Sequence, residues 1–199
     1  LLLLFNLLLS IFFDKFIRMD FKLVFEKLIT FFDENNIRYA LMGGFALGAQ
    51  GVVRSTTDID FLIHQEDMSR VHVFMVDLGY ERRYHSENVS QYTSSDKLMG
   101  EVDFINAFRD TAVRMLERAE VKSIFNHIHS IKILKVEDLI GFKVQAIAND
   151  PSRKNLDLAD IESLINLHKE TMDWKTIGGY FTLFELNDLF ENLKGKYTS

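Results

Sequence analysis

The sequence predicts an α+β protein in which a mixed β-sheet flanked by helices is followed by a C-terminal helical part. Two observations lead to this prediction. Over residues 19–135, short apolar segments with strand-like alternation are interspersed with segments whose apolar residues have helical spacing. From residue 136 onward, every periodic segment has helical spacing. We therefore expect a core over residues 19–135 and a helical region over residues 136–199.

An amphipathic helix over residues 20–35 is the first expected element, because apolar side chains recur there at helical spacing. Residues 111–118 fit either a turn of helix or a connection between strands. In chain order, the other elements expected in the core are a strand over 37–42, a tight Gly43-Gly44 turn with a short helix to 50, a loop over 51–57, a strand over 58–64, a helix over 66–78, strands over 80–84, 90–93 and 101–106, and a hairpin of 121–125 with 130–134. The expected C-terminal helices cover 136–148, 153–169, 174–181 and 183–193.

The composition excludes several kinds of site. The chain has no cysteine, which removes disulfides, thiolate zinc sites and cysteine nucleophiles together. A net charge of -6 and a pI near 5.5 argue against a generally basic nucleic-acid-binding surface, although they allow a local basic patch. A cysteine-free chain suits a reducing compartment, so a cytoplasmic location is expected.

Residues 1–18 are considered apart from the core. Residues 1–13 are nearly all apolar, but they are too few for a membrane span, which needs about 20 residues. The segment also lacks the basic region and the cleavage site of a secretory signal, and the first methionine is Met19. We interpret residues 1–18 as an over-extended reading frame or a stray leader; the alternative is a short membrane-associating segment. No stable membrane association is expected.

Asp58 and Asp60 occupy alternate positions of the strand predicted over residues 58–64. Such residues point to the same face of a strand, about 6–7 Å apart along the chain, while Ile59 and Phe61 point to the core. Two carboxylates on one face repel each other, and a divalent cation removes that cost. Mg²⁺ is usually held by one or two carboxylates together with substrate phosphates. The pair therefore predicts half of a Mg²⁺ site, unless Asp58 only caps the strand and Asp60 faces solvent.

Two further segments give the carboxylate pair a context. Gly43-Gly44 follows the preceding strand and enters a short helix, where backbone N–H groups can approach a phosphate closely. Asp103 lies on a second acidic strand, over residues 101–106. A third carboxylate beside the pair would complete a two-metal site or act as the base that deprotonates an attacking hydroxyl. A plain strand-to-helix turn and a solvent-facing acid are the respective alternatives.

Together these residues resemble a known signature. Gly43-Gly44, Gly51 and the run Arg54-Ser55-Thr56-Thr57-Asp58-Ile59-Asp60 resemble the signature of the DNA polymerase β-like nucleotidyltransferase superfamily. Within it, the chain is similar to the AbiEii-type nucleotidyltransferases of bacterial toxin–antitoxin and phage-defence systems, with one extra residue after Arg54. Residues 136–143 and 153–161 resemble the lysine-bearing helix and the Arg/Lys–Asp–x–x–Asp segment of that family. The resemblance thus covers residues 20 to about 170.

The resemblance implies a minimal nucleotidyltransferase fold and a role for individual residues. Mg²⁺, with Mn²⁺ as a substitute, would be held by Asp58, Asp60 and Asp103. These three residues and Lys143, which would approach the phosphates or the acceptor, would be catalytic. The nucleotide would be bound by Gly43, Gly44, Arg54 and Thr57. In the alternative interpretation, Lys143 is a solvated helix lysine, and Asp157 and Asp160 pair with Arg153 or Lys154 at helical spacing.

The implied activity is transfer of a nucleoside monophosphate (NMP) from an NTP, ATP being expected, to an acceptor hydroxyl, with release of pyrophosphate. The acceptor would be RNA, such as a tRNA end, or a protein, and a cognate antitoxin would be a partner. Two alternatives stay open: a catalytically silent nucleotide-binding module with a regulatory or antitoxin role, and a small-molecule adenylyltransferase. The intact carboxylates at 58, 60 and 103 argue against the silent module, since a degenerate site usually loses one.

Overall fold

The computed structural model describes residues 20–124 and 129–198 of the chain. In the core, the elements are α2 (Phe21–Glu34), β1 (Tyr39–Met42), α3 (Gly43–Ala49), β2 (Asp58–His64), the 3-10 turn η1 (Gln65–Asp67), α4 (Met68–Asp77), β3 (Tyr80–His85), β4 (Val89–Ser94), β5 (Glu101–Ala107), α5 (Asp110–Glu117), β6 (Glu120–Ile124) and β7 (His129–Ile133). The C-terminal elements are α6 (Val136–Asn149), η2 (Pro151–Arg153), α7 (Lys154–His168), α8 (Trp174–Leu183) and α9 (Asn187–Thr198). The expectations for residues 1–18 and for Phe125 lie outside the described residues.

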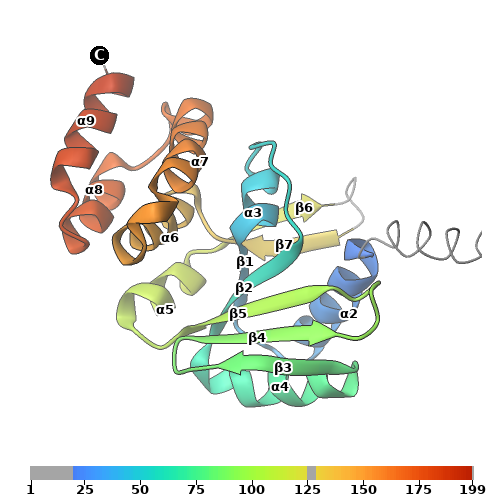
Figure 1. Cartoon of the computed structure of the whole chain (residues 1–199). Helices are drawn as coiled ribbons and strands as arrows, with labels where there is room; N and C mark the ends of the chain where they lie inside the picture. The colour runs from blue at the N-terminus through green and yellow to red at the C-terminus, as the bar shows by residue number, and fades with distance from the viewer. Residues whose placement is uncertain (1–19, 125–128, 199) are drawn as a thin grey trace, which may run out of the picture.

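One seven-stranded sheet, in the order β3-β4-β5-β2-β1-β7-β6, forms the centre of the molecule (Figure 1). The pairs β2–β5 and β1–β7 are parallel, and the other neighbouring pairs are antiparallel. The predicted α+β class with a mixed sheet is confirmed. The four C-terminal helices α6 to α9 gather at one end of the molecule, beside α3 and α5 (Figure 1). The boundary at residue 135 between a core and a helical region stays a prediction.

Most element bounds agree with the sequence prediction to within a few residues; one helix start is wrong, and one segment that the sequence left open is decided. The helix predicted over residues 183–193 is wrong at its start, because α8 continues to Leu183 and α9 begins only at Asn187. Glu185 has a φ of +58° in the turn between them, which ends the first helix. The segment at 111–118 is the helix α5. None of the helices in the described part of the chain is long and apolar enough to span a membrane.

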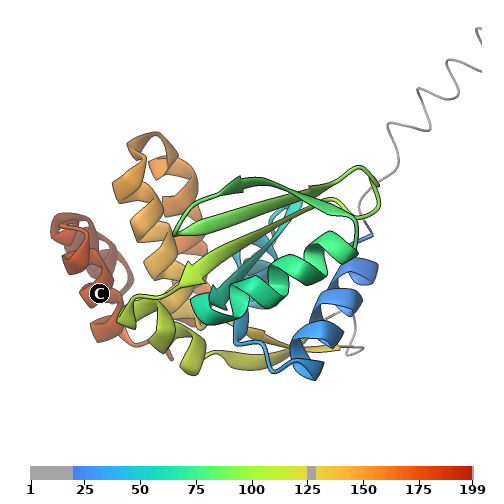
Figure 2. The same cartoon turned by 90° about the horizontal axis from the view of Figure 1, so that it is seen from below.

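Aromatic side chains fill the core between the sheet and the helices α2 and α4, which lie on the same face of it (Figure 2). Phe61 of β2 is fully buried, with its ring centroid 5.3 Å from that of Phe32 in α2 and 6.1 Å from that of Phe104 in β5. The rings of Phe31 and Phe74 stack at 3.9 Å and join α2 to α4. Because Ile59 and Phe61 occupy this apolar face, the intervening residues of β2 must face the opposite side of the sheet.

A buried ion pair links the core to the C-terminal helices. Asp138 of α6 is 0% exposed and accepts hydrogen bonds from the Arg118 guanidinium, which follows α5, and from the hydroxyl of Tyr180 in α8 at 2.6 Å. The Arg118 Nε donor lies 2.8 Å from Asp138 Oδ2. The ring of Tyr180 also packs on Gly141, where an added Cβ would lie 2.8 Å from it. These contacts fix the direction in which α6 enters the molecule.

Replacing Asp138 by alanine is expected to lower the free energy of unfolding by about 3–5 kcal/mol, because it leaves the Arg118 charge partly buried without its partner. Urea denaturation followed by circular dichroism measures this loss. Asp77→Ala, at an exposed acid at the end of α4, is the matched control and should change stability by less than about 0.5 kcal/mol. Equal stability of the two variants would contradict the structural role of the pair.

Candidate active site

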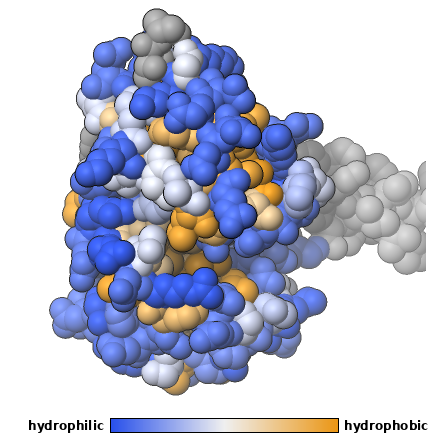
Figure 3. Space-filling model, turned by 90° about the vertical axis from the view of Figure 1, so that its left-hand side faces the viewer, coloured by the Kyte–Doolittle hydropathy of each residue, from blue (hydrophilic) through white to orange (hydrophobic). Residues whose placement is uncertain are grey.

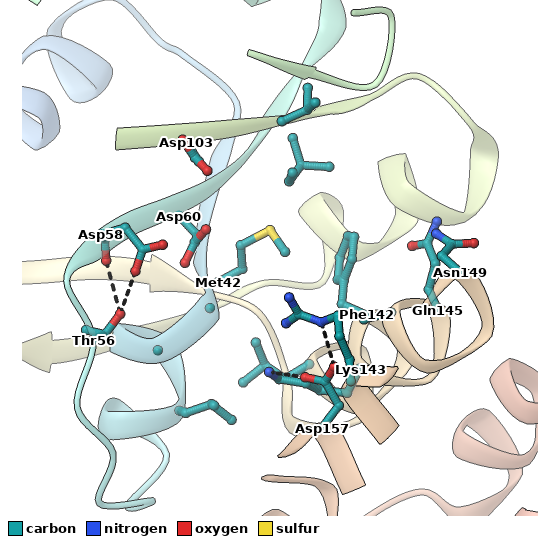
Figure 4. Close-up of a pocket in the computed structure, with 18 of the residues that line it drawn as sticks. Met42, Thr56, Asp58, Asp60, Asp103, Phe142, Lys143, Gln145, Asn149 and Asp157 are labelled. Atoms are coloured by element: carbon teal, nitrogen blue, oxygen red, sulfur yellow. Dashed lines mark hydrogen bonds and ion pairs between the residues drawn. The ribbon is translucent and has the colours of Figure 1, made fainter. Parts of the chain in front are cut away.

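Three aspartates from two neighbouring strands meet on the face of the sheet opposite the aromatic core (Figure 4). Because β2 and β5 are parallel and in register, Asp60 lies directly beside Asp103, and Asp58 is two residues away on the same strand. One carboxylate oxygen from each of Asp58, Asp60 and Asp103 lies within 4.8 Å of the other two. The structure thus brings together the three carboxylates proposed from the sequence as metal ligands.

Burial and mutual repulsion raise the pKa values of two of these carboxylates. The pKa of Asp60 is raised to about 7, first by burial and then by the charges of Asp58 and Asp103, against the opposing influence of Lys143 and Arg54. Burial also raises the pKa of Asp103. Three oxygen ligands at this spacing, with a charge repulsion that a cation would relieve, fit a divalent metal ion such as Mg²⁺.

The repulsion predicts a pH effect in metal-free protein. A raised pKa means that folded Asp60 keeps its proton between about pH 4 and pH 7 while unfolded Asp60 loses it, so Asp60 lowers stability progressively over that interval. In EDTA, Asp60→Asn should therefore become more stable than wild type as pH rises, by up to about 4 kcal/mol above pH 7.

Urea unfolding at pH 5 and pH 8 in EDTA measures this difference. Asp77→Asn, which changes an exposed acid in the same way, should show no comparable gain. A stability difference between Asp60→Asn and wild type that is independent of pH would contradict the proposed repulsion.

Gly43 and Gly44 allow α3 to start immediately beside the carboxylates. Gly43 has a φ of +64°, a conformation that favours glycine, and an added Cβ there would lie 2.6 Å from the carboxylate carbon of Asp60. An added Cβ at Gly44 would lie 2.5 Å from Cβ of Thr56. Both glycines are thus required by close packing around the site. The sequence prediction placed them in a turn before the helix, whereas they are its first two residues.

The loop before β2 contributes Thr56 to the site rather than Thr57. The Thr56 hydroxyl donates a hydrogen bond of 2.9 Å to Asp58 Oδ1, and Thr56 lines the cavity over the carboxylates. Thr57, which was expected to bind nucleotide, is exposed and does not line that cavity. Arg54, in the same loop, does line it. The two threonines are adjacent in sequence, so only the backbone course of the loop distinguishes them.

Two buried acids on α7 hold three basic side chains at the opposite wall of the cavity. Lys143 Nζ lies 2.7 Å from Asp157 Oδ1 and 2.8 Å from Asp160 Oδ2 (Figure 4 shows the Asp157 pair). Arg153 Nε donates to Asp157 at 3.0 Å, and the Arg54 guanidinium pairs with Asp160. The expected helical pair of Arg153 with Asp157 is therefore present. Asp160, however, binds Arg54 and Lys143 across the fold.

Sequence reasoning missed several polar residues of the site. Gln91 of β4 donates a hydrogen bond of 2.8 Å to Asp103 Oδ2, from the position in register with it. The cavity above the carboxylates has a volume of about 470 Å³, and its wall also includes Asn88, Gln145 and Asn149. Gln145 and Asn149 lie four residues apart on α6, which is a helical spacing, but the family resemblance pointed only to Lys143 on this helix.

A mixed sheet with three clustered carboxylates and a glycine pair packed against them is the arrangement expected of a nucleotidyltransferase. Residues 21–180 match the model of a family described as uncharacterised nucleotidyltransferases, so the chain belongs to that family. It is accordingly an enzyme of the nucleotidyltransferase class, as the sequence predicted. No curated protein matches the chain.

Several solved structures share the fold. The solution structure of the antibiotic-resistance factor ANT(2'')-Ia has a TM-score of 0.63 and 14% identity, covering 90% of this chain and 99% of that chain. An antigenic nucleotidyltransferase-like protein from Paracoccidioides brasiliensis has a TM-score of 0.55 and 18% identity, covering 88% and 92% respectively. The lincosamide antibiotic adenylyltransferase LnuA has a TM-score of 0.53 and 15% identity, covering 75% and 99%. At these identities the similarity shows a common fold.

Proposed function

We propose that the protein transfers an NMP group from an NTP to an acceptor hydroxyl, with Mg²⁺ held by Asp58, Asp60 and Asp103. The observation that carries the proposal is the spacing of these carboxylates, together with three basic side chains on the facing wall of the same cavity. A bound divalent ion would neutralise the phosphates and orient them for in-line attack. Mn²⁺ would serve as a substitute, and ATP is the proposed nucleotide.

In this proposal the acceptor oxygen forms a bond to the α-phosphorus, and the bond from that phosphorus to the bridging oxygen breaks. The electron pair leaves with pyrophosphate, and the hydroxyl proton passes to Asp103. Asp103 lies beside Asp60 on the same face of the sheet, within reach of a group bound at the metal site, and Gln91 holds one of its carboxylate oxygens with a hydrogen bond. Lys143 and Arg54 face the departing phosphates, while Gly43 and Gly44 keep the backbone close to the nucleotide.

The biological setting proposed from the AbiEii-type resemblance is a toxin–antitoxin or phage-defence system in the cytoplasm. It supplies an RNA end or a protein hydroxyl as acceptor and an antitoxin protein as partner. A small-molecule acceptor is the second candidate. It is supported by two proteins of the same fold, since ANT(2'')-Ia is known in complex with adenylyl-2''-tobramycin and LnuA with lincomycin.

The proposal is tested by incubating the protein with each α-labelled NTP, Mg²⁺, and extracts that supply RNA, protein and small solutes. A double variant, Asp58→Ala with Asp60→Ala, is run in parallel. We expect label transfer by the wild type, and we expect its loss in the double variant and in EDTA. Transfer that survives in the double variant would refute the site. NTP binding without transfer to any extract would favour the silent nucleotide-binding module.

A further inference from the structure

A second hollow lies beside the cavity over the carboxylates, and its wall includes none of the basic side chains Arg54, Lys143 and Arg153. It has a volume of about 590 Å³ and lies between β5 and α5 on one side and α6 and α8 on the other. The side of the molecule on which α5 and α8 lie has apolar side chains gathered in its middle, bordered by hydrophilic ones (Figure 3). The two hollows adjoin each other, because Asn88, Ile105, Phe142, Gln145 and Asn149 belong to the walls of both.

The wall of this second hollow combines aromatic and aliphatic side chains with neutral polar ones, which are Asn106 and Thr111 and the amides shared with the first hollow. Its aromatic rings come from Phe108, between β5 and α5, from Tyr180 of α8 and from Phe184, directly after α8. Among residues 20–124 and 129–198, no aspartate or glutamate lines it, and the one charged wall residue is Arg109, which is exposed and lies 5.2 Å from the Phe108 ring centroid. An ammonium group bound inside would therefore lose its hydration without gaining a carboxylate partner.

The position of the second hollow relative to the reacting groups suits it to bind the acceptor rather than the phosphates. In-line attack places the acceptor opposite the departing pyrophosphate. Arg54, Lys143 and Arg153 line the first hollow but not the second. The second hollow instead begins at Ile105, which lies two residues beyond Asp103 on the same face of β5. A molecule seated there would present a hydroxyl to the carboxylate proposed as the base.

From this arrangement we infer that the acceptor is a small, ring-bearing alcohol without positive charge. The inference rests on the proposed transfer of an NMP group, and it selects the second candidate acceptor, a small molecule, over RNA or protein. The volume falls within the range of about 300–1,000 Å³ that is usual for small-molecule sites, which also combine apolar walls with a few polar groups. The side-chain amides of Asn88, Gln145 and Asn149 are the groups that would bind its hydroxyls. An RNA acceptor would need further basic residues around the hollow for its phosphates, and within the described part of the chain the wall offers only Arg109.

The charge class is tested with wild-type protein, Mg²⁺, α-labelled NTP and four acceptor pools prepared from a cell extract. These are total RNA, soluble protein, and solutes below the cut-off of a small-pore filter, divided by cation exchange into a retained and an unretained pool. We expect label in the unretained solutes. Label mainly in the retained solutes, in RNA or in protein would overturn the inference, as would the absence of label from every pool in a protein that binds NTP with Mg²⁺.

The location is tested with Ala112→Phe, because Ala112 of α5 lines the second hollow and not the first. Filling the hollow should lower label transfer at least about tenfold, while the dissociation constant for NTP with Mg²⁺ stays within about twofold of wild type. Ala148→Phe makes the same change at an exposed position of α6 outside both hollows and should have no effect. Thermal unfolding establishes that each variant is folded.

These measurements separate the two proposals. If Ala112→Phe loses NTP affinity by the same factor as it loses label transfer, the second hollow binds the nucleotide, and the inference is overturned. Failure of the wild type to bind any NTP with Mg²⁺ would refute the proposed function itself. If Ala112→Phe does not fold, the pools tested with wild-type protein still decide the charge class.

Discussion

Replacing Gly43 by alanine is expected to abolish nucleotidyl transfer while leaving most of the fold intact. The new methyl group would occupy the space of the Asp60 carboxylate, whose carbon would lie 2.6 Å away, and the φ of +64° is unfavourable for alanine. Asp60 must then move, and the proposed metal site loses its geometry. We expect kcat/KM to fall by at least about 10³-fold, because a small misplacement of reacting groups alone costs about 10²-fold. Steady-state kinetics of pyrophosphate release measures this loss.

Gly48→Ala is the matched control within the same helix. A Cβ added at Gly48 would meet no atom of the described residues within 4 Å outside the adjoining backbone of its own helix, so the methyl group fits without displacement. Alanine there should stabilise α3 by about 0.5–1 kcal/mol and leave the kinetics unchanged. A Gly43→Ala enzyme with wild-type activity would show that the approach of α3 to Asp60 is irrelevant to catalysis.

Lys143→Met is expected to reduce kcat/KM by about 10²–10³-fold, the usual cost of removing one preorganised electrostatic contact to a transition state. Lys143 lies in the cavity wall and is close enough to Asp60 to lower its pKa. Asp157 and Asp160 hold it there, and each retains an arginine partner after the change. The variant should therefore lose activity while it stays folded. A thermal unfolding curve shows whether it is folded at the assay temperature.

Lys175→Met, at an exposed lysine of α8, is the control for removal of one positive charge and should be fully active. Retention of wild-type kcat/KM by Lys143→Met would mean that the lysine only neutralises the two acids of α7. An equal loss in both variants would indicate an effect of overall charge rather than of position.

The sequence contained enough information to predict the carboxylates because their geometry is local. Two residues apart on a strand, Asp58 and Asp60 share a face whatever the rest of the fold does. Asp103 required one further inference, that its strand lies beside theirs, and the parallel register of β2 and β5 meets that condition. The glycine pair was likewise predictable as a feature of the strand-to-helix junction, although its crowding against Asp60 depends on the sheet.

Contacts between distant segments were less accessible. Arg54 and Asp160 are separated by 106 residues, and no periodicity relates a loop before β2 to a helix near the C-terminus. Helical spacing relates only residues three or four apart on one helix. It therefore predicted the Arg153–Asp157 pair correctly and missed the partners of Asp160, which lie on other elements. Which of the two threonines, Thr56 or Thr57, lines the cavity depends on the course of the loop before β2. The second hollow depends on the packing of α8 against α6, where the sequence indicates only that both are helices.

The central claim is that Asp58, Asp60 and Asp103 hold a divalent ion that joins the nucleotide to the protein. Its most direct test is an anomalous-difference map from crystals soaked with Mn²⁺ and a non-hydrolysable NTP analogue. The account predicts a peak within about 2.0–2.6 Å of carboxylate oxygens of Asp58 and Asp60, with the phosphates directed toward Arg54 and Lys143. A peak bound elsewhere, or a nucleotide seated without metal at these carboxylates, would contradict it.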